Sequence, residues 1–197
     1  SARGGDAARR YARGAFRRVD GWLSGLDAGM IDIIGRHQNA QGVIGSLGEI
    51  GVHHGRLFIL LALLLKGEER AFAVDIFEDQ DLNLDRSGQG SEAVFRRNLA
   101  RFGVPAERVA VLRGSSLAVT WPQIEAEVGM PARIFSVDGG HTAAITANDL
   151  AIADAALAEG GVILLDDYFN PEFPEVSEGL CRYLAAGRRL VPFAIGD

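Results

Sequence analysis

Apolar residues along this chain gather in short continuous runs, and these runs alternate with segments of helical spacing. The runs predict strands over residues 43–52, 71–77, 109–113, 133–137, 161–165 and 190–195. The helical patterns predict helices over residues 55–65, 91–102, 121–128, 147–159 and 175–186. Continuously apolar strands are typical of a parallel sheet covered by helices on both faces. The pattern therefore predicts a doubly wound α/β fold with a mostly parallel sheet.

The start of the chain has a different character. Residues 1–20 hold six arginines against two aspartates, and we interpret them as a solvated, partly disordered helix. A basic arm for a partner or an acidic substrate is the alternative. Residues 21–38 place apolar side chains three and four apart, which predicts one further helix with the stripe Trp22, Leu23, Leu26, Met30, Ile33 and Ile34. We therefore separate a basic N-terminal arm with a lid or cover helix, residues 1–38, from an α/β domain, residues 39–197.

Composition narrows the class of protein. The 197 residues are 48% hydrophobic, enough for one sizeable core, and the longest apolar run, residues 57–65, falls well short of a membrane span. A net charge of −6 argues against nucleic-acid binding. The start shows no secretory signal, and the single cysteine, Cys181, fits a reducing compartment and is expected to be buried on a helix. We expect a cytoplasmic protein without nucleic-acid or membrane partners.

Polar or glycine-rich segments follow five of the predicted strands. In an open α/β sheet, ligands bind outside the carboxyl ends of the strands, so these segments should share one binding rim. They are residues 49–55, Asp75, residues 114–116, residues 138–141 and the pair Asp166 and Asp167.

The first of these segments reads GEIGVHHG, from Gly48 to Gly55. Its glycines allow close approach of the backbone to a ligand, and the following helix offers free N–H groups. Its spacing differs from the G-x-G-x-x-G of dinucleotide folds, which disfavours a nicotinamide dehydrogenase. Asp75 lies twenty residues after Gly55, a suitable place for a carboxylate that accepts both hydroxyls of a ribose. A tight turn and an acid without a ligand are the alternative.

The segments GEIGVHHG, AVDIFE, FSVDGGH and GGVILLDDYF resemble the successive motifs of class I S-adenosylmethionine-dependent methyltransferases. Within that class the chain is similar to metal-dependent O-methyltransferases of the macrolide-sugar and catechol type. The resemblance implies a Rossmann-like domain over residues 39–197 that binds S-adenosylmethionine and methylates a hydroxyl of a small molecule. It also implies cofactor contacts. Glu49, Gly51 and Gly55 would line the methionine and ribose parts, Asp75 would hold the ribose hydroxyls, and Ser116 would lie near the adenine.

Asp138, Asp166 and Asp167 follow two predicted strands and are expected on neighbouring strand ends. Carboxylates brought together repel one another, and a hard divalent cation relieves that repulsion. Oxygen ligands alone suit Mg²⁺, which would lower the pKa of a bound substrate hydroxyl. In metal-dependent relatives the third ligand is often Asn or Asp, so Asp167 fits. A capping role for one acid and solvation of the other is the alternative.

The relatives often read D-G-D-H around the first metal aspartate, whereas Gly140 replaces the second acid here. The catalytic candidates are therefore Asp138 and His141, because the ordinary pKa of histidine lies near neutrality and suits a general base. A structural role for His141, bonded to a backbone carbonyl, is equally open. Asp149 is expected to cap or buttress the next helix.

Three further features belong to this picture. Adjacent residues rarely point at one ion, so we favour packing or a substrate contact for His53 and His54 over metal ligation.

Methyltransferases of this class usually end with an antiparallel hairpin, so either the final strand is missing from the sequence or a partner, such as a second copy of the chain, completes the sheet. A metal-dependent hydroxylase-like relative on the same fold, or a cofactor-binding module without turnover, are the alternative functions.

Overall fold

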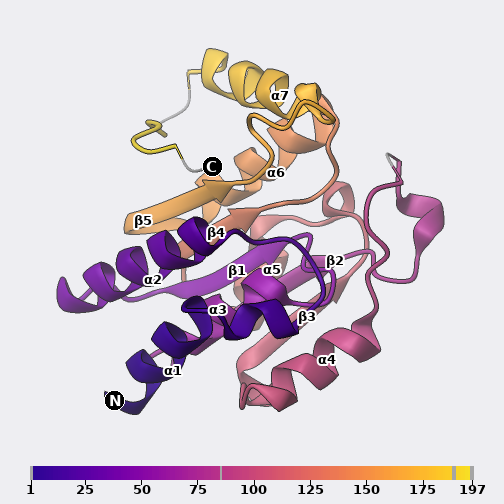
Figure 1. Cartoon of the computed structure of the whole chain (residues 1–197). Coiled ribbons are helices and arrows are strands. Elements are labelled where there is room, and N and C mark those ends of the chain that lie inside the picture. The colour runs from indigo at the N-terminus through magenta and orange to yellow at the C-terminus, as the bar shows by residue number, and fades with distance from the viewer. Residues whose placement is uncertain (1, 85, 188–189, 196–197) are drawn as a thin grey trace.

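A five-stranded parallel sheet lies at the centre of the fold, with helices packed on both of its faces (Figure 1). This computed structural model describes residues 2–84, 86–187 and 190–195. The strands are β1 (Ser46–Ile50), β2 (Ala71–Asp75), β3 (Val109–Arg113), β4 (Ala132–Val137) and β5 (Leu157–Leu165). Their order is β3-β2-β1-β4-β5, and every pairing is parallel. The predicted doubly wound α/β architecture is confirmed.

The helices divide between the two faces of the sheet. One face is covered by α1 (Ala2–Ala12), α2 (Gly25–Ala40), α3 (Arg56–Leu63) and α4 (Glu92–Arg101). The other is covered by α5 (Trp121–Val128), α6 (Ala143–Ala156) and α7 (Pro174–Ala185). Four short 3₁₀ helices, η1 (Ala15–Arg18), η2 (Gln80–Leu82), η3 (Ala106–Arg108) and η4 (Ser116–Ala118), lie in the connections. Among the described residues, no helix combines the length and apolarity needed to cross a bilayer.

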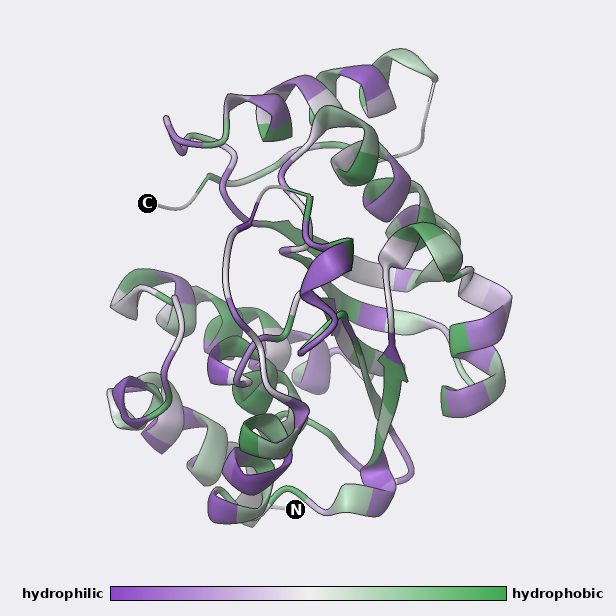
Figure 2. Ribbon diagram, turned by 90° about the vertical axis from the view of Figure 1, so that its right-hand side faces the viewer, coloured by the Kyte–Doolittle hydropathy of each residue, from purple (hydrophilic) through white to green (hydrophobic). Residues whose placement is uncertain are grey.

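The core follows from the alternation of side chains along each strand. Leu47 and Ile134 point into the layer of α3, whereas Phe72 and Phe135 point toward α5 and α6. The rings of Phe72 and Phe135 meet edge to face with centroids 4.9 Å apart. A Cβ at Gly48 would lie 2.2 Å from the Phe72 ring, which explains a glycine within β1. In Figure 2 the strands are mostly hydrophobic, while the outer helices alternate between hydrophobic and hydrophilic residues.

The N-terminal segment is helical but not solvated. Tyr11, Phe16 and Val19 are buried in the same apolar cluster as α3, and the Tyr11 hydroxyl donates to the carbonyl of Arg56 at 2.7 Å. The expectation of a solvated, partly disordered helix is therefore wrong for this part of the chain. Its apolar side chains recur on one face and pack, while the arginines at 9, 10, 13, 17 and 18 remain exposed.

Two further expectations need correction. Residues 190–195 form no strand; Val191, Phe193 and Ile195 are exposed, and Pro192 has no N–H to donate to a ladder. The helix predicted over 21–38 begins at Gly25, because the Ser24 side chain accepts a hydrogen bond from the N–H of Asp27. Within it, the apolar stripe is only partly covered, since Leu26 and Ile33 are exposed.

A fully buried ion pair fastens the amino-terminal edge of the sheet. The guanidinium of Arg133 donates to Glu69 through Nε at 2.9 Å and through Nη2 at 3.0 Å. Arg133 also donates to the Gln38 side chain at 3.1 Å and to the carbonyl of Leu64 at 2.8 Å. The N–H groups of Gly45 and Lys66 complete the partners of the Glu69 carboxylate. Each charge is therefore compensated in the interior.

Removing one charge of this pair should destabilise the protein strongly. Glu69→Gln leaves the Arg133 guanidinium buried without a counter-charge, so we expect a loss of about 3–5 kcal/mol in the free energy of unfolding, measured by urea denaturation. Glu68→Gln, at the exposed neighbouring position, is the matched control and should change stability little. Equal effects of the two substitutions would contradict this role of the pair.

Candidate functional site

A cavity of about 1460 Å³ opens along the carboxyl ends of the strands. Seven of the nine residues proposed from the sequence line it: Gly51, Asp75, Ser116, Asp138, His141, Asp166 and Asp167. Trp22 and the α2 residues Met30 and Ile34 form an apolar wall of the same cavity. The predicted rim is thus one continuous site. Glu49 and Gly55 lie just behind its surface.

Gly51 occupies the tightest point of the turn that follows β1. Its φ of 87° lies in the left-handed region, and a Cβ there would lie 1.7 Å from the carbonyl oxygen of Asp138. Both the backbone conformation and the close approach of β4 therefore require glycine. The backbone of Gly51 is exposed to the cavity, which leaves room for a ligand against the turn.

Gly55 ends the same turn and begins α3. Its φ is 88°, and a Cβ there would lie 2.8 Å from the ring of Phe95 on α4. Gly55 therefore allows α3 and α4 to pack closely beneath the turn. This packing fixes the start of α3, whose first N–H groups face the region of the turn.

Asp75, at the end of β2, is held in a fixed orientation by the backbone. One oxygen accepts from the N–H of His53 at 2.8 Å and the other from the N–H of Phe77 at 2.5 Å. Burial raises the pKa of this carboxyl, while these hydrogen bonds lower it. A carboxylate oxygen has more than one acceptor position, so Asp75 can still receive two hydroxyl groups from the cavity side.

Glu49 is buried on β1, two positions before Gly51, where the turn begins. Among the described residues its Oε2 has no hydrogen-bond partner. Burial raises the pKa of Glu49 well above its usual value, and the nearby carboxylates of Asp166 and Asp75 raise it further. The unpaired Oε2 of this buried acid is suited to accept from a cationic group of a ligand.

The aspartates after β4 and β5 meet at one edge of the sheet. The N–H of Asp166 donates to the carbonyl of Val137 at 3.1 Å, so the ladder between the two strands continues to the aspartates. Burial raises the pKa of Asp138 well above its usual value, and Asp166 is the strongest of the neighbouring charges that raise it further. The sequence-based expectation that these acids stand on neighbouring strand ends is met by the geometry.

Within this edge, the closest group differs from the one expected. Ligand atoms of Asp138, His141 and Asp167 lie within 4.8 Å of one another. Asp167 has a positive φ of 59°, which turns its side chain differently from that of Asp166. The Asp166 carboxylate accepts from the N–H of Asp167 at 2.9 Å and lies beside the group rather than in it.

His141 is oriented by contacts on both ring nitrogens and on one ring face. Its Nε2 lies 3.0 Å from Oδ2 of Asp167, and its Nδ1 lies 3.2 Å from the hydroxyl oxygen of Ser87. The ring stacks on Phe173 with centroids 3.7 Å apart and planes 9° apart. Ser87 had not been selected from the sequence, because it lies in an irregular loop distant from His141 in the chain.

Ser116 lines another part of the cavity, and Asp149 is buried nearby on α6. The Asn148 side chain donates to the carbonyl of Ser116 at 3.4 Å and to Asp149 at 3.0 Å. Thr142, not Asp149, caps α6, because the helix begins four residues earlier than predicted. Asp149 is fully buried within the helix, and burial raises its pKa to about 6. Of the two roles expected for Asp149, capping is therefore wrong, whereas buttressing of the helix stays a prediction.

Cys181 is exposed on α7, so the expectation that it is buried is also wrong.

A protein family and several solved structures resemble this chain. A family model described as a methyltransferase domain matches residues 49–168. Among solved structures, the O-methyltransferase NovP is similar with a TM-score of 0.67 and 20% identity, over 83% of this chain and 74% of that one. CalS11, a TDP-rhamnose 3'-O-methyltransferase of calicheamicin biosynthesis, gives 0.63 and 19%, over 85% and 75%. The O-methyltransferase TomG from Streptomyces achromogenes, solved with S-adenosylmethionine, gives 0.61 and 20%, over 93% and 78%. No curated protein matches the sequence.

Substituting Gly51 tests the close approach of β1 and β4. Gly51→Ala places a methyl group against the Asp138 carbonyl and strains the left-handed backbone, so we expect a loss of about 3–5 kcal/mol in the free energy of unfolding. Gly103→Ala is the control, because Gly103 also has a positive φ, of 73°, but a Cβ there meets nothing within 4 Å. It should cost only about 1–2 kcal/mol. Urea denaturation measures both, and equal costs would contradict the steric argument.

Asp149 should make stability depend on pH. Its pKa is raised from 3.8 in its usual environment to about 6 in the folded protein. Between these values the folded state binds more protons than the unfolded state, so the free energy of unfolding falls as pH rises through this window. Asp149→Asn removes the titration. The stability of the wild type relative to this variant should fall by about 3 kcal/mol between about pH 4 and pH 7. Parallel pH curves for the two proteins would refute the assignment.

Proposed function

The chain belongs to the methyltransferase domain family and is a class I S-adenosylmethionine-dependent methyltransferase, and on that premise we propose that it methylates a hydroxyl of a small molecule with the help of a divalent metal ion. The observation that carries the proposal is the shared cavity. The glycine turn after β1 and the carboxylates after β4 and β5 line the same space, so a methyl donor and an oxygen acceptor can meet there.

We assign the cofactor to the region between the turn and η4. Gly51 would face its methionine and ribose parts, Asp75 would accept the ribose hydroxyls, and Ser116 would lie near the adenine. The fixed orientation of the Asp75 carboxylate supports this assignment. The unpartnered buried oxygen of Glu49 suits the amino group of the methionine part.

The donor set after β4 and β5 fits a magnesium ion. Asp138 and Asp167 already hold ligand atoms within 4.8 Å of each other, and Asp166, which lies beside them, would add its carboxylate oxygen by rotation of its side chain. Burial and the neighbouring carboxylates both raise the pKa of Asp138, and a cation would relieve this cost of negative charge. When bound there, Mg²⁺ would lower the pKa of the acceptor hydroxyl. These aspartates would hold the ion, and the exposed side of Asp166 leaves access for an acceptor from the cavity.

His141 is our candidate for the general base. Its Nε2 lies 3.0 Å from Oδ2 of Asp167, close to where an acceptor hydroxyl would lie. Nε2 would take the hydroxyl proton once Asp167 is engaged by the ion and no longer accepts from the ring. Stacking on Phe173 and the contact of Nδ1 with Ser87 would fix the plane of the ring. Relatives often have a second acid at the position of Gly140. Because glycine cannot take a proton, another group must do so in this chain, and we assign that role to His141.

The cavity also indicates the kind of acceptor. Its volume of about 1460 Å³ exceeds that of a usual single-ligand pocket, so a nucleoside and an acceptor can be accommodated together. The apolar wall of Trp22, Met30 and Ile34 suits an acceptor with an apolar face, such as a phenol or a sugar attached to a natural product. CalS11, with a similar fold, acts on a nucleotide-linked sugar. The net charge of −6 favours a small molecule over a nucleic acid, and a reducing, cytoplasmic setting fits the single cysteine.

Removal of the metal ligands should abolish methyl transfer. Asp138→Asn weakens both the proposed ion site and the placement of the acceptor, so we expect turnover to fall by roughly 10²-fold or more, measured as S-adenosylhomocysteine release with a panel of phenols and nucleotide sugars. The wild type should lose activity with a chelator and regain it with added Mg²⁺. Asp6→Asn, at an exposed position on α1, is the control for removal of a negative charge.

Product mass decides between chemistries. A gain of one CH₂ supports methyl transfer, and a gain of one oxygen would overturn it in favour of hydroxylation. Full activity of Asp138→Asn in chelator-treated protein would refute the role of the metal.

A further inference from the structure

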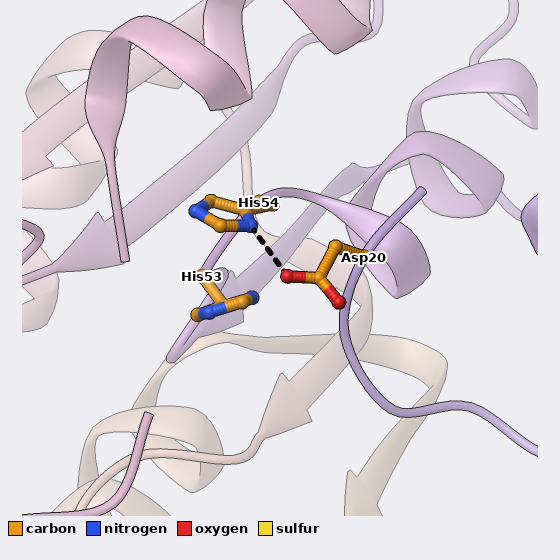
Figure 3. Close-up of side chains that lie close together, drawn as sticks. All are labelled: Asp20, His53 and His54. Atoms are coloured by element: carbon orange, nitrogen blue, oxygen red, sulfur yellow. Dashed lines mark ion pairs between the residues drawn. The ribbon is translucent and has the colours of Figure 1, made fainter. Parts of the chain in front are cut away.

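Asp138, Asp166 and Asp167, at the carboxyl ends of β4 and β5, are here called the aspartate edge. A second group of potential metal ligands lies outside it. Asp20, in the loop between η1 and α2, approaches His53 and His54 of the turn after β1 (Figure 3). One ligand atom from each of the three side chains lies within 4.8 Å of the other two, and Nδ1 of His54 is 3.3 Å from Oδ2 of Asp20. We propose that Asp20, His53 and His54 form a binding site for a divalent transition-metal ion such as Zn²⁺.

The turn explains how two adjacent histidines can serve one ion. In an extended strand, successive side chains point to opposite sides. His53 instead has a positive φ of 49°, and its N–H is fixed by the hydrogen bond to Asp75. The two imidazole rings consequently lie one above the other, with centroids 3.8 Å apart and planes 37° apart. Figure 3 shows both rings presenting a nitrogen toward the Asp20 carboxylate.

The state of the ring nitrogens favours a ligand. Nδ1 of His53 and Nδ1 of His54 are both buried, and neither makes a hydrogen bond of good geometry with the described residues. Nδ1 of His54 instead approaches the Asp20 carboxylate at 3.3 Å. Coordination of an ion between these atoms would satisfy both nitrogens and the carboxylate. Asp20 supplies the negative charge that compensates the cation.

The composition of the group separates it chemically from the aspartate edge. Two imidazole nitrogens and one carboxylate oxygen suit Zn²⁺ and related ions, whereas oxygen-only ligands suit Mg²⁺. The Asp20 side chain is 82% exposed, which gives the ion an entry path and leaves a coordination position for water. The Nε of Arg56, at the start of α3, donates to the carbonyl of Val19 at 2.7 Å.

Coordination would join two separate parts of the cavity wall. Gly21 and Trp22, which follow Asp20 in the chain, line the cavity, and so does His53. The Trp22 ring already lies 5.2 Å from the ring of His53. An ion held by Asp20 and the two histidines would therefore fix the loop before α2 against the turn after β1.

The test measures Zn²⁺ binding to the full chain without any methyl donor, after removal of metals with a chelator. Asp138→Asn with Asp167→Asn provides a background in which the aspartate edge is weakened. In that background, His54→Gln and His53→Asn should each weaken Zn²⁺ binding by about tenfold or more in calorimetry. Asparagine is chosen for position 53 because it tolerates a positive φ. His37→Gln, an exposed histidine on α2, is the control and should bind as the background does.

Two further readouts keep the proposal falsifiable. Co²⁺ should give the visible absorption of a nitrogen-ligated ion, and this absorption should be lost in His54→Gln. Asp20→Asn changes a side chain that is largely exposed, so its weaker Zn²⁺ binding should occur with an unchanged melting temperature in the absence of metal. Zn²⁺ affinity equal in the background, His54→Gln and Asp20→Asn would overturn the site. Because no methyl transfer is measured, that result would leave the proposed function untouched.

Discussion

Parallel pairing of β4 with β5 forces the carboxylates of Asp138 and Asp166 to the same edge of the sheet. Burial raises the pKa of Asp138, and the neighbouring Asp166 raises it further, so negative charge at this place carries a free-energy cost that a divalent cation would relieve. This cost links the fold to the proposed chemistry, because an ion placed there also has access to the cavity in which a hydroxyl acceptor would lie.

The turn after β1 serves several neighbours at once. Gly51 permits the close approach of the Asp138 backbone, and the N–H of His53 orients the Asp75 carboxylate. The same left-handed conformation of His53 brings its ring over that of His54 and toward Asp20. A change in this turn would therefore affect the proposed donor site, the aspartate edge and the histidine group together. The turn therefore holds these three groups in their relative positions.

The fold was largely predictable because buried parallel strands and their covering helices leave strong local patterns. The bounds of β3 and α5 match those expected from the sequence, since each is a compact apolar segment between clear turn residues. The rim residues were also predictable, because topology alone places strand ends together. Other features depend on contacts between distant segments. The burial of Tyr11, the contact of Ser87 with His141 and the common direction of His53 and His54 are of this kind. The strand expected over 190–195 failed because an apolar pattern does not supply a pairing partner.

The central claim is that a methyl donor and a divalent ion share the cavity at the carboxyl ends of the strands. A crystal structure of the protein soaked with S-adenosylhomocysteine and Mg²⁺ tests it most directly. The account predicts the nucleoside against Gly51 with its ribose on Asp75, and an ion bound by oxygens of Asp138, Asp166 and Asp167. A nucleoside bound elsewhere, or an ion bound away from these aspartates while the nucleoside occupies the cavity, would contradict it.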